Sequence, residues 1–449
     1  MKDANTMTRV VDQIRTQEKS ERQQAIIDSF VRNQGDLMRR DPKAWRGKFR
    51  KMAASPFAFY RGSASLFYAD VSRDADPFLN AQTSRVWIQG DLHAENFGTY
   101  MNGAGVLVFD VNDFDEAYVG PFTWDVKRLA ASLALIGHAK ALSDAEIRRL
   151  IDACARGYAD QIARFNAGKD GDFAVTLANA TGKVRQVLQD ARLLTRVALL
   201  DQETDIVDGD RRFRDGKATE RLDDATRAKV EAALAGYVDS IPDAKRRAAM
   251  AYAVKDVVKR RGVGIGSAGL TMFSVLIEGE TQALENDIII SMKVAQPAAP
   301  SRHVPDENIR AYFLHDGERT TVSQLALQAH ADPLLGHAML EGTGGMYVAE
   351  VSPYTADLEW DDINDMDELT EVVDMLGRCV AKIHSVSDVD SAQTLIDYST
   401  ELAIHGVLEG KVDDFAAYVC DFGQQYGEQV RDDHRLFVDA FRNGLFGLV

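Results

Sequence analysis

Cysteine is scarce in this sequence, and the spacing of the few cysteines excludes the common cysteine-based sites. The 449 residues include three, Cys154, Cys379 and Cys420, which lie far apart and form no C-x-x-C pair. No two of the nine histidines have the spacing of a zinc site. The sequence therefore predicts neither a zinc centre nor a dithiol motif, and such cysteine usage is typical of a reducing compartment.

Long apolar runs are also missing. The N-terminal stretch "MKDANTMTRVVDQIRTQEKS" has no apolar segment of the kind found in signal peptides. No later run approaches the length needed to cross a bilayer. We therefore expect a cytoplasmic protein with no membrane partner.

Basic residues are outnumbered by acidic ones, with 52 Lys and Arg against 69 Asp and Glu and a formal net charge of −17. This charge disfavours binding to nucleic acids and to anionic membranes, because both are negatively charged. A cationic small molecule would suit the protein better. The sequence gives no indication of the oligomeric state.

The patterns divide the chain into helical and strand-rich parts. Near Val257 helical periodicity gives way to β-branched runs, which are separated by a glycine cluster and a polar turn and predict a small antiparallel sheet. We therefore expect an α+β protein with a small β-rich lobe and a large, mainly helical lobe. The expected divisions are 1–85 (N-terminal helical part of the large lobe), 86–250 (polar loops with helices), 251–352 (β-rich lobe) and 353–449 (C-terminal helical part of the large lobe).

Two stretches have distinctive local patterns. The charged, glycine-containing "DIVDGDRRFRDGKATERL" at residues 205–222 predicts an exposed loop or a mobile insertion. Helical periodicity between residues 322 and 340 predicts a helix, and the short "GMYVAEV" that follows predicts a strand.

Polar residues gather where two apolar, strand-like runs end. Asp91 and Asn96 follow "VWIQG" in the pattern D-x-x-x-x-N, and "DFD" at residues 113–115 follows "GVLVFDVN". In kinases the Asp of this spacing accepts a hydroxyl proton, while the Asn and a D-F-G Asp bind Mg²⁺. We assign Asp91 as the catalytic residue and, as metal ligands, Asn96, Asp113 and Asp115. A capped turn and a solvated acidic loop would use the same residue types, so either loop alone leaves both interpretations open.

Glycine is concentrated in "GVGIGSAG" at residues 262–269, which contains G-x-G-x-x-G. A dinucleotide-binding fingerprint would open a helix, whereas the following "LTMFSVLIEG" is typical of a strand. The pattern therefore favours a glycine hairpin that covers phosphate groups, with an ordinary flexible turn as the alternative. The candidate nucleotide-binding residues here are Gly264, Gly266, Ser267 and Gly269.

Lys293 lies in the strand-like "DIIISMKVAQ", where a lysine among apolar residues needs an anionic partner. Kinases place a lysine on such a strand to hold the α and β phosphates. A lysine on an edge strand that faces solvent is the alternative.

Two further residues are weaker candidates, and one class of enzyme lacks its motif. Arg61 in "FYRG" is a candidate anion contact, with a packing or salt-bridge role as the alternative. His93 in "GDLH" is a candidate for orienting the loop through a backbone hydrogen bond. The nucleophile motif G-x-S-x-G is absent, which argues against a serine hydrolase of that kind.

Several of these segments resemble known families. "GDLHAENFG", "NDFDEA" and "GPFTWDVKRLAASL" are similar to the catalytic and metal-binding segments of aminoglycoside phosphotransferases and choline kinases, whose structural Asp would correspond to Asp125. Together, "SPFAFYRG", "GDLHAENFG", "GVGIGSAG" and "MKVAQP" resemble a bacterial family catalogued as domain of unknown function 2252, over roughly residues 52–384. The kinase resemblance implies a two-lobed protein kinase-like fold with a nucleotide between the lobes.

The order of the segments differs from that of ordinary kinases. The catalytic and metal loops come before the glycine loop and Lys293, and "LGRCVAKIHS", which is similar to the helix before the catalytic loop, comes near the end. One circular permutation accounts for this order, and such a change is tolerated where natural termini lie close together. Where kinases carry the glutamate that pairs with the lysine, this chain has Val322 and Ser323, with only Glu318 nearby.

We therefore expect an ATP-dependent phosphotransferase that acts on an unidentified hydroxyl acceptor, most simply a small molecule, with ATP and Mg²⁺ as cofactors. A catalytically inactive nucleotide-binding regulator is an alternative suggested by the missing glutamate. A nucleotidyl transferase that moves AMP would use the same residue types. A structural or interaction protein would bind neither nucleotide nor metal.

Overall fold

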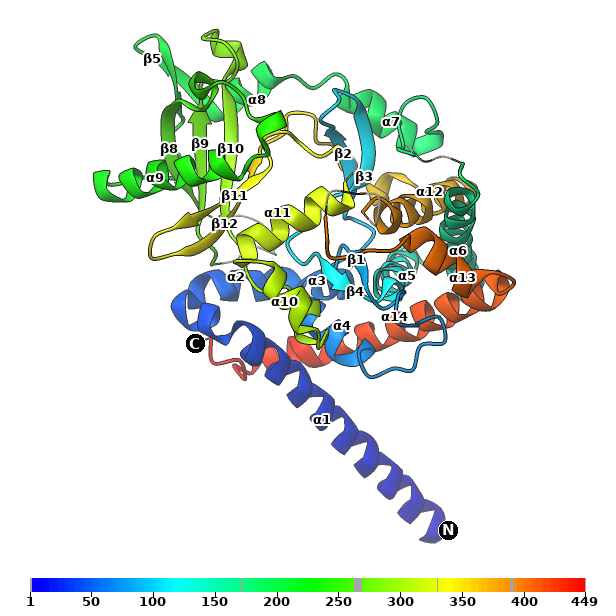
Figure 1. Cartoon of the computed structure of the whole chain (residues 1–449). Coiled ribbons are helices and arrows are strands. Elements are labelled where there is room, and N and C mark those ends of the chain that lie inside the picture. The colour runs from blue at the N-terminus through cyan, green and yellow to red at the C-terminus, as the bar shows by residue number, and fades with distance from the viewer. Residues whose placement is uncertain are drawn as a thin grey trace.

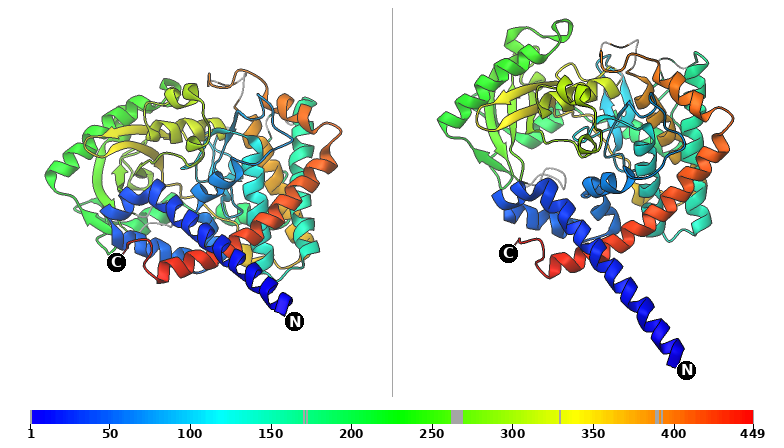
Figure 2. Two further views of the ribbon diagram at one scale, coloured as in Figure 1. Left: turned by 90° about the horizontal axis from the view of Figure 1, so that it is seen from below. Right: turned by 60° about the horizontal axis from the view of Figure 1, so that its bottom comes forward.

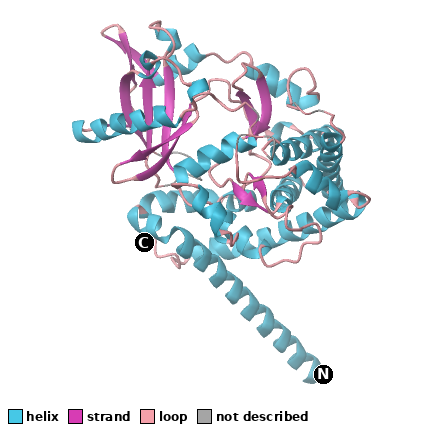
Figure 3. Cartoon of the chain, in the orientation of Figure 1, coloured by secondary structure: helices cyan, strands magenta, loops and turns pink. Residues whose placement is uncertain are grey.

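The chain folds into a strand-rich part and a larger helical part that lie side by side (Figure 1). This computed structural model describes residues 2–169, 171, 173–261, 269–328, 330–387, 391 and 393–448. Most of the strands gather in one part of the molecule, while helices form most of the rest (Figure 3). The expected α+β class is confirmed.

Helices and short strands alternate along the chain. The helices of the described part are α1 (Lys2–Arg40), α2 (Pro42–Met52), α3 (Pro56–Arg61), α4 (Ala64–Val71), α5 (Phe122–Ala139), α6 (Asp144–Asn166), α7 (Gly182–Ala191), α8 (Arg196–Glu203), α9 (Asp224–Ser240), α10 (Glu307–Tyr312), α11 (Asp316–Leu327), α12 (Met366–Ser385), α13 (Thr400–Leu408) and α14 (Val412–Arg442). The strands are β1 (Val86–Ile88), β2 (Phe97–Met101), β3 (Leu107–Val111), β4 (Tyr118–Gly120), β5 (Thr204–Val207), β6 (Asp210–Phe213), β7 (Thr219–Arg221), β8 (Val254–Arg260), β9 (Met272–Ile277), β10 (Ile288–Val294), β11 (Gly336–Leu340) and β12 (Gly344–Glu350).

The helical part is organised around the close crossing of α6 and α12. A Cβ atom on Gly377 of α12 would overlap the carbonyl oxygen of Cys154, and one on Gly157 of α6 would lie 2.6 Å from the carbonyl oxygen of Asp374. These glycines therefore allow the two helices to approach more closely than larger residues would. Among the described residues, none of the helices has the length and apolar character needed to cross a membrane.

The strand-rich part is built on a six-stranded antiparallel sheet in the order β11-β12-β10-β9-β8-β7. Ile290 and Met292 of β10 pack into an apolar core together with residues of α9. Because side chains alternate between the faces of a strand, Lys293 lies on the opposite face. Tyr347 of β12, the register partner of Lys293, shares that face.

Two short antiparallel ribbons carry the polar loops. β1 pairs with β4, and β2 pairs with β3. Asp91 follows β1 and Asp113 follows β3, so each loop begins where a buried strand ends. Helices α5, α11 and α12 all contact β1, and the ribbons lie between the sheet and the helical part (Figure 1).

The N-terminal helices lie against the last long helix. α1 contacts α14 and α4, and α3 also contacts α14 (Figure 2). Arg22 of α1 donates hydrogen bonds to Asp70 at 2.7 and 2.9 Å and to Asp433 at 2.6 and 2.8 Å. Asp433 is fully buried, and a buried carboxylate requires such a partner. This ion-pair cluster links segments that lie at opposite ends of the sequence.

The prediction of a loop at residues 205–222 is wrong. This stretch forms the hairpin β5–β6 and the strand β7, and β7 pairs with β8 at the edge of the six-stranded sheet. Asp208 and Gly209, with φ angles of +53° and +82°, connect β5 to β6. An Asp-Gly pair is a strong signal for this kind of two-residue turn. The high charge of the segment concealed that signal: most of β5 is exposed, whereas Arg211 and Phe213 of β6 are buried.

The helix predicted between residues 322 and 340 is confirmed only as far as Leu327, while the strand predicted for "GMYVAEV" is confirmed as part of β12. α11 ends at Leu327, and the stretch from Gly336 to Leu340 forms β11. Pro333 opposes continuation of a helix to residue 340, because proline lacks an amide donor and disfavours helical geometry in the residue before it.

The helix crossing predicts a contrast between two glycine substitutions. Gly377→Ala should lower the free energy of unfolding by roughly 1–3 kcal/mol, because the added methyl group meets backbone that cannot easily move. Gly236→Ala in α9 has no atom within 4 Å of the new Cβ and should be neutral or stabilising by about 0.5–1 kcal/mol. Urea unfolding followed by circular dichroism measures both. Equal effects would show that the crossing is not tight.

Candidate functional site

The loop that carries Asp91 is held by one buried carboxylate. Asp125, near the start of α5, accepts hydrogen bonds from the backbone amides of Gln89 and Gly90, at 2.6 and 3.0 Å. Gly90 has a φ of +82°, and a Cβ atom there would overlap a facing carbonyl oxygen. His384 of α12 places Nε2 3.4 Å from the same carboxylate. Asp125 therefore fixes the strand end from which Asp91 projects.

The Asp91 carboxylate is paired with a buried cation. Arg128, which is fully buried on α5, donates to Asp91 from Nε at 2.7 Å and also from Nη2. Burial raises the pKa of Asp91 to about 7; the Arg128 charge opposes the rise, and Glu116 adds to it. Asp91 is therefore present in both protonation states near neutral pH, which suits a general base.

The second polar loop lies directly beside the first. Gln89 donates from Nε2 to the carbonyl oxygen of Asn112 at 3.2 Å and also to that of Asp113. Asn96 donates from Nδ2 to the carbonyl oxygen of Asp91 at 2.9 Å. Asp113 has a φ of +55°, which is uncommon for a residue other than glycine. The structure thus brings the candidate residues of the two loops together.

Lys293 reaches the second loop from the sheet. Its ammonium group forms an ion pair with the carboxylate of Asp115. Burial acts to lower the pKa of Lys293, but the charges of Asp115 and Asp113 outweigh it and raise the pKa. Loss of hydration and then repulsion from Asp115 raise the pKa of Asp113. This contact joins the strand-rich part to the helical part at the acidic loop.

A cavity of about 530 Å³ opens beside this ion pair. Lys293 and Tyr347 line it from the sheet, and Asp113 and Asp115 line it from the second loop. Residues of the segment 350–355, which leaves β12, also contribute to its wall. A cavity of this volume suits a small-molecule ligand. Both signs of charge are present where the sheet meets the loop.

Helix α11 contacts the second loop through an arginine. Arg319, 3% exposed, donates from Nη2 to the carbonyl oxygen of Asp115 at 2.8 Å. Glu318 instead accepts a hydrogen bond from a backbone amide just before the helix, at 2.5 Å. Among the described residues, Asp115 is the ion-pair partner of Lys293, and α11 supplies none. Ser323, which lies where kinases carry the glutamate that pairs with the lysine, therefore does not pair with Lys293.

The oxygen atoms around the second loop fit Mg²⁺ bound together with phosphate groups. Asp113 and Asp115 offer carboxylates at the cavity, whereas Asn96, whose Nδ2 donates to the carbonyl oxygen of Asp91, does not line it. Within the described ranges no cluster of three or more His, Cys, Asp or Glu side chains forms a complete metal site. Mg²⁺ is usually bound by one or two carboxylates plus substrate phosphates, so the residues present fit that mode.

The glycine cluster is described only in part. Gly264, Gly266 and Ser267 lie outside the described residues. Gly269 is described and has a φ of +76°, a conformation that favours glycine. A Cβ atom on Gly269 would lie 3.3 Å from Nε1 of Trp45. Gly269, the last residue of the glycine cluster, therefore lies against helix α2.

Arg61 and His93 have structural partners near the loops. Arg61 forms an ion pair with Glu95, and its charge also lowers the pKa of Asp113, against the stronger effects that raise it. His93 is 2% exposed and packs against the ring of Phe57, with 5.9 Å between ring centroids. Burial lowers the pKa of His93 well below its usual value, so its imidazole stays neutral near pH 7.

Our sequence reasoning missed Arg128 and Glu116. Apart from His138, the ionisable side chains of α5 are confined to Asp125, Lys127 and Arg128, in a helix whose other side chains are largely buried. Charged side chains in a buried helix need partners of opposite charge. Their presence in this apolar segment could therefore have indicated buried ion pairs. Arg128 lies three residues after Asp125 and so on the same helix face. Glu116 gave no comparable signal, because it lies in an acidic run.

The Asp125 hydrogen bonds predict a measurable loss of stability. Asp125→Asn replaces one carboxylate oxygen with an NH₂ group that cannot accept from a backbone amide, so we expect the free energy of unfolding to fall by about 1–3 kcal/mol. The matched control Asp190→Asn changes an exposed residue of α7 and should stay within about 0.5 kcal/mol of wild type. Urea unfolding compares the two. Equal stability of both variants would remove the role given to Asp125.

Comparisons with known proteins support a family assignment. No curated protein and no solved structure matches the chain. The model of a family described as "Uncharacterized protein conserved in bacteria (DUF2252)" matches residues 40–440, which include both polar loops and the whole six-stranded sheet. The chain therefore belongs to the DUF2252 family.

Proposed function

We propose that this protein is an ATP-dependent phosphotransferase with a circularly permuted, kinase-like arrangement. The observation that carries the proposal is the ion pair between Lys293 and Asp115, which lies at a cavity of about 530 Å³ that Asp113 also lines. A lysine from a sheet and two acidic residues from a facing loop are the groups that kinases use to hold a nucleotide and its metal.

The arrangement of elements supports the kinase comparison. In the sequence, the glycine cluster comes between the paired strands β8 and β9, and Lys293 belongs to the next strand, β10. Helix α11 follows β10 in the chain, as helix αC follows the lysine strand in kinases. The loops of Asp91 and Asp113 meet this sheet from residues that come earlier in the sequence. A permutation keeps these spatial relations while changing the order of the segments.

Each side chain has a specific role in this proposal. Asp91 accepts the proton of the acceptor hydroxyl, and its pKa of about 7 suits that role. Asn96 and Asp113 hold Mg²⁺, and Asp115 supports them. When bound, the metal neutralises charge that develops on the transferred phosphoryl group. Lys293 binds phosphate oxygens through its ammonium group.

The cavity also suggests how the nucleotide lies. Its charged wall, formed by Lys293 and Asp113, suits the phosphates, and the segment 350–355 lines the part that would receive the base. The acceptor is a hydroxyl-bearing small molecule in this proposal. The net charge of −17 favours a cationic acceptor over an anionic one.

A nucleotide-binding regulator without catalysis is the second candidate. The specific observation is that Lys293 pairs with Asp115, one of the expected metal ligands, whereas α11 offers it no glutamate. A lysine that competes for a metal ligand would weaken metal binding. Transfer of AMP, the further alternative, would release pyrophosphate in place of ADP, so product analysis distinguishes it.

Two substitutions should separate nucleotide binding from chemistry. Lys293→Met removes the cation that faces the phosphates, so we expect Mg²⁺-dependent ATP binding to weaken by about tenfold or more. Asp91→Asn keeps the size of the side chain but cannot accept the proton, so ATP affinity should stay within about twofold while turnover falls by about 100-fold or more. Isothermal titration measures binding, and chromatography of the nucleotide products measures turnover.

The control for these variants is Lys229→Met, which changes an exposed lysine of α9 and should alter neither quantity. Folded wild-type protein that binds no ATP with or without Mg²⁺ would overturn the nucleotide site. Binding without turnover would select the non-catalytic regulator. Turnover that is unchanged in Asp91→Asn would remove the catalytic role of Asp91.

The raised pKa of Asp91 predicts the pH dependence of turnover. Asp91 accepts a proton only when it is ionised, so turnover at saturating ATP and Mg²⁺ should rise as the pH increases through about 7. The Arg128 charge lowers the pKa of Asp91, so Arg128→Gln should move the midpoint to higher pH. A pH–rate profile of both proteins tests this. A midpoint that does not move would contradict the coupling of the two residues.

A further inference from the structure

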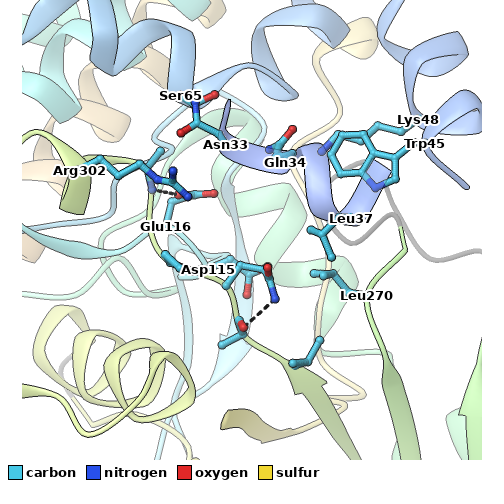
Figure 4. A pocket seen from close by; sticks show the side chains of 15 residues that line it. Asn33, Gln34, Leu37, Trp45, Lys48, Ser65, Asp115, Glu116, Leu270 and Arg302 are labelled. Carbon is cyan, nitrogen blue, oxygen red and sulfur yellow. Dashed lines mark hydrogen bonds between the residues drawn. The ribbon is translucent and has the colours of Figure 1, made fainter. Parts of the chain in front are cut away.

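A second, smaller cavity also borders the acidic loop. Its volume is about 90 Å³, and it is enclosed by helices α1 and α2, by Asp115 and Glu116, and by residues 294–299 after β10. Figure 4 shows Trp45 and Lys48 on one side of this cavity and Glu116 and Arg302 on the opposite side. Asp115 lines both this cavity and the larger one, so the two adjoin at the same carboxylate.

Lys48 of α2 is a buried cation that has no ion-pair partner among the described residues. It is 6% exposed, and its Nζ lies 4.5 Å from the centroid of the Trp45 ring. Burial lowers the pKa of Lys48 to about 8, although Glu116 and Asp91 are close enough to oppose this. A buried ammonium group without an adjacent anion is costly, and such groups are normally paired. The site therefore favours an added negative charge.

Trp45 supplies a second donor that lacks a partner. Its side chain is 1% exposed, and Nε1 has no hydrogen-bond acceptor in the described part of the chain. Buried indole N–H groups usually have an acceptor. The end of the glycine turn lies beside this atom, because a Cβ atom on Gly269 would be 3.3 Å from Nε1. An acceptor bound at Trp45 would thus lie next to the segment that we expect to cover phosphates.

The carboxylates of this cavity are already engaged elsewhere. Asp115 pairs with Lys293, and Glu116 accepts a hydrogen bond from the backbone amide of Ala299 at 2.5 Å. Neither carboxylate lies within ion-pair distance of Lys48. The positive charge of Lys48 therefore remains available for a ligand.

We propose that Lys48 and Trp45 form an oxyanion site that receives a phosphoryl-type group beside Asp115. We assign the terminal phosphate of ATP as this group, and that assignment rests on the proposed function. The site itself does not, because a free phosphate or an anionic group of an acceptor has the same chemistry. Helix α2 would then contribute a second lysine to the phosphate site, in addition to Lys293.

The first test compares ATP with ADP. Lys48→Met keeps the length of the side chain and removes its charge, and Lys51→Met on the exposed side of the same helix is the matched control. With Mg²⁺ present, we expect Lys48→Met to weaken ATP binding by about tenfold or more and ADP binding by less than about twofold. Lys51→Met should change neither affinity. Isothermal titration gives all of these values.

The second test uses inorganic phosphate and does not depend on nucleotide binding. Isothermal titration should show saturable binding of phosphate to wild type, with a matching change in tryptophan fluorescence, and both Lys48→Met and Trp45→Phe should weaken the titrated binding by about tenfold or more. If phosphate binds in this way while wild type binds no ATP, the oxyanion site stands and the proposed kinase function fails. If phosphate binding depends on Lys48 while ATP and ADP affinities do not, the anion comes from a source other than the nucleotide.

The inference is overturned if a folded Lys48→Met protein changes neither the ratio of ATP to ADP affinity nor phosphate binding. Circular dichroism establishes whether the variant is folded. Should it not fold, Trp45→Phe, which removes only the N–H donor and keeps an aromatic ring, provides the same comparison. Unchanged nucleotide and phosphate binding in that variant would then decide against the site.

Discussion

The hydrogen bonds from two backbone amides to the Asp125 carboxylate are the constraint on which the site depends. These hydrogen bonds are shielded from solvent, because Asp125 is fully buried. A buried carboxylate must be compensated by hydrogen-bond donors. The two amides that Asp125 requires therefore fix the backbone at Gln89 and Gly90. Asp91 follows Gly90 directly in the chain. Arg128, one helical turn after Asp125, donates a hydrogen bond to the carboxylate of Asp91. One helix therefore positions both the backbone and the charge of the candidate catalytic residue.

The same principle explains how the two parts of the molecule meet. Because side chains alternate along β10, Lys293 points away from the apolar core beneath α9. Its ammonium group forms an ion pair with Asp115 of the helical part. Arg319 adds hydrogen bonds from α11 to backbone oxygens of the same region, including that of Asp115. The interface is thus made of charged groups that need partners. Lys48 has no ion-pair partner in the part of the chain that the structure describes, and this points to a ligand.

Much of the site could be inferred from the sequence because its signals are local. Asp91 and Asn96 lie five residues apart in one loop, and Asp113 follows an apolar strand, so spacing alone indicated which residues to consider. The errors arose where one local signal was weighed above another. The charges of residues 205–222 outweighed the Asp-Gly turn that forms the β5–β6 hairpin. In the same way, apolar periodicity outweighed Pro333, after which the chain forms β11 instead of continuing α11.

The sequence by itself determined the α+β class, the strand of Lys293, and the placement of carboxylates at strand ends, because periodicity and turn chemistry act over a few residues. Only the tertiary structure decided the partners of those charges. Lys293 and Asp115 are 178 positions apart, and Arg128 and Asp91 are 37 apart. Trp45 and Lys48 lie on helix α2, and only the folded structure shows that they line a cavity together with Asp115. Burial and ion pairing are properties of the folded arrangement, so no local pattern could show that Lys48 and Asp115 line one cavity, or that Lys48 has no ion-pair partner among the described residues.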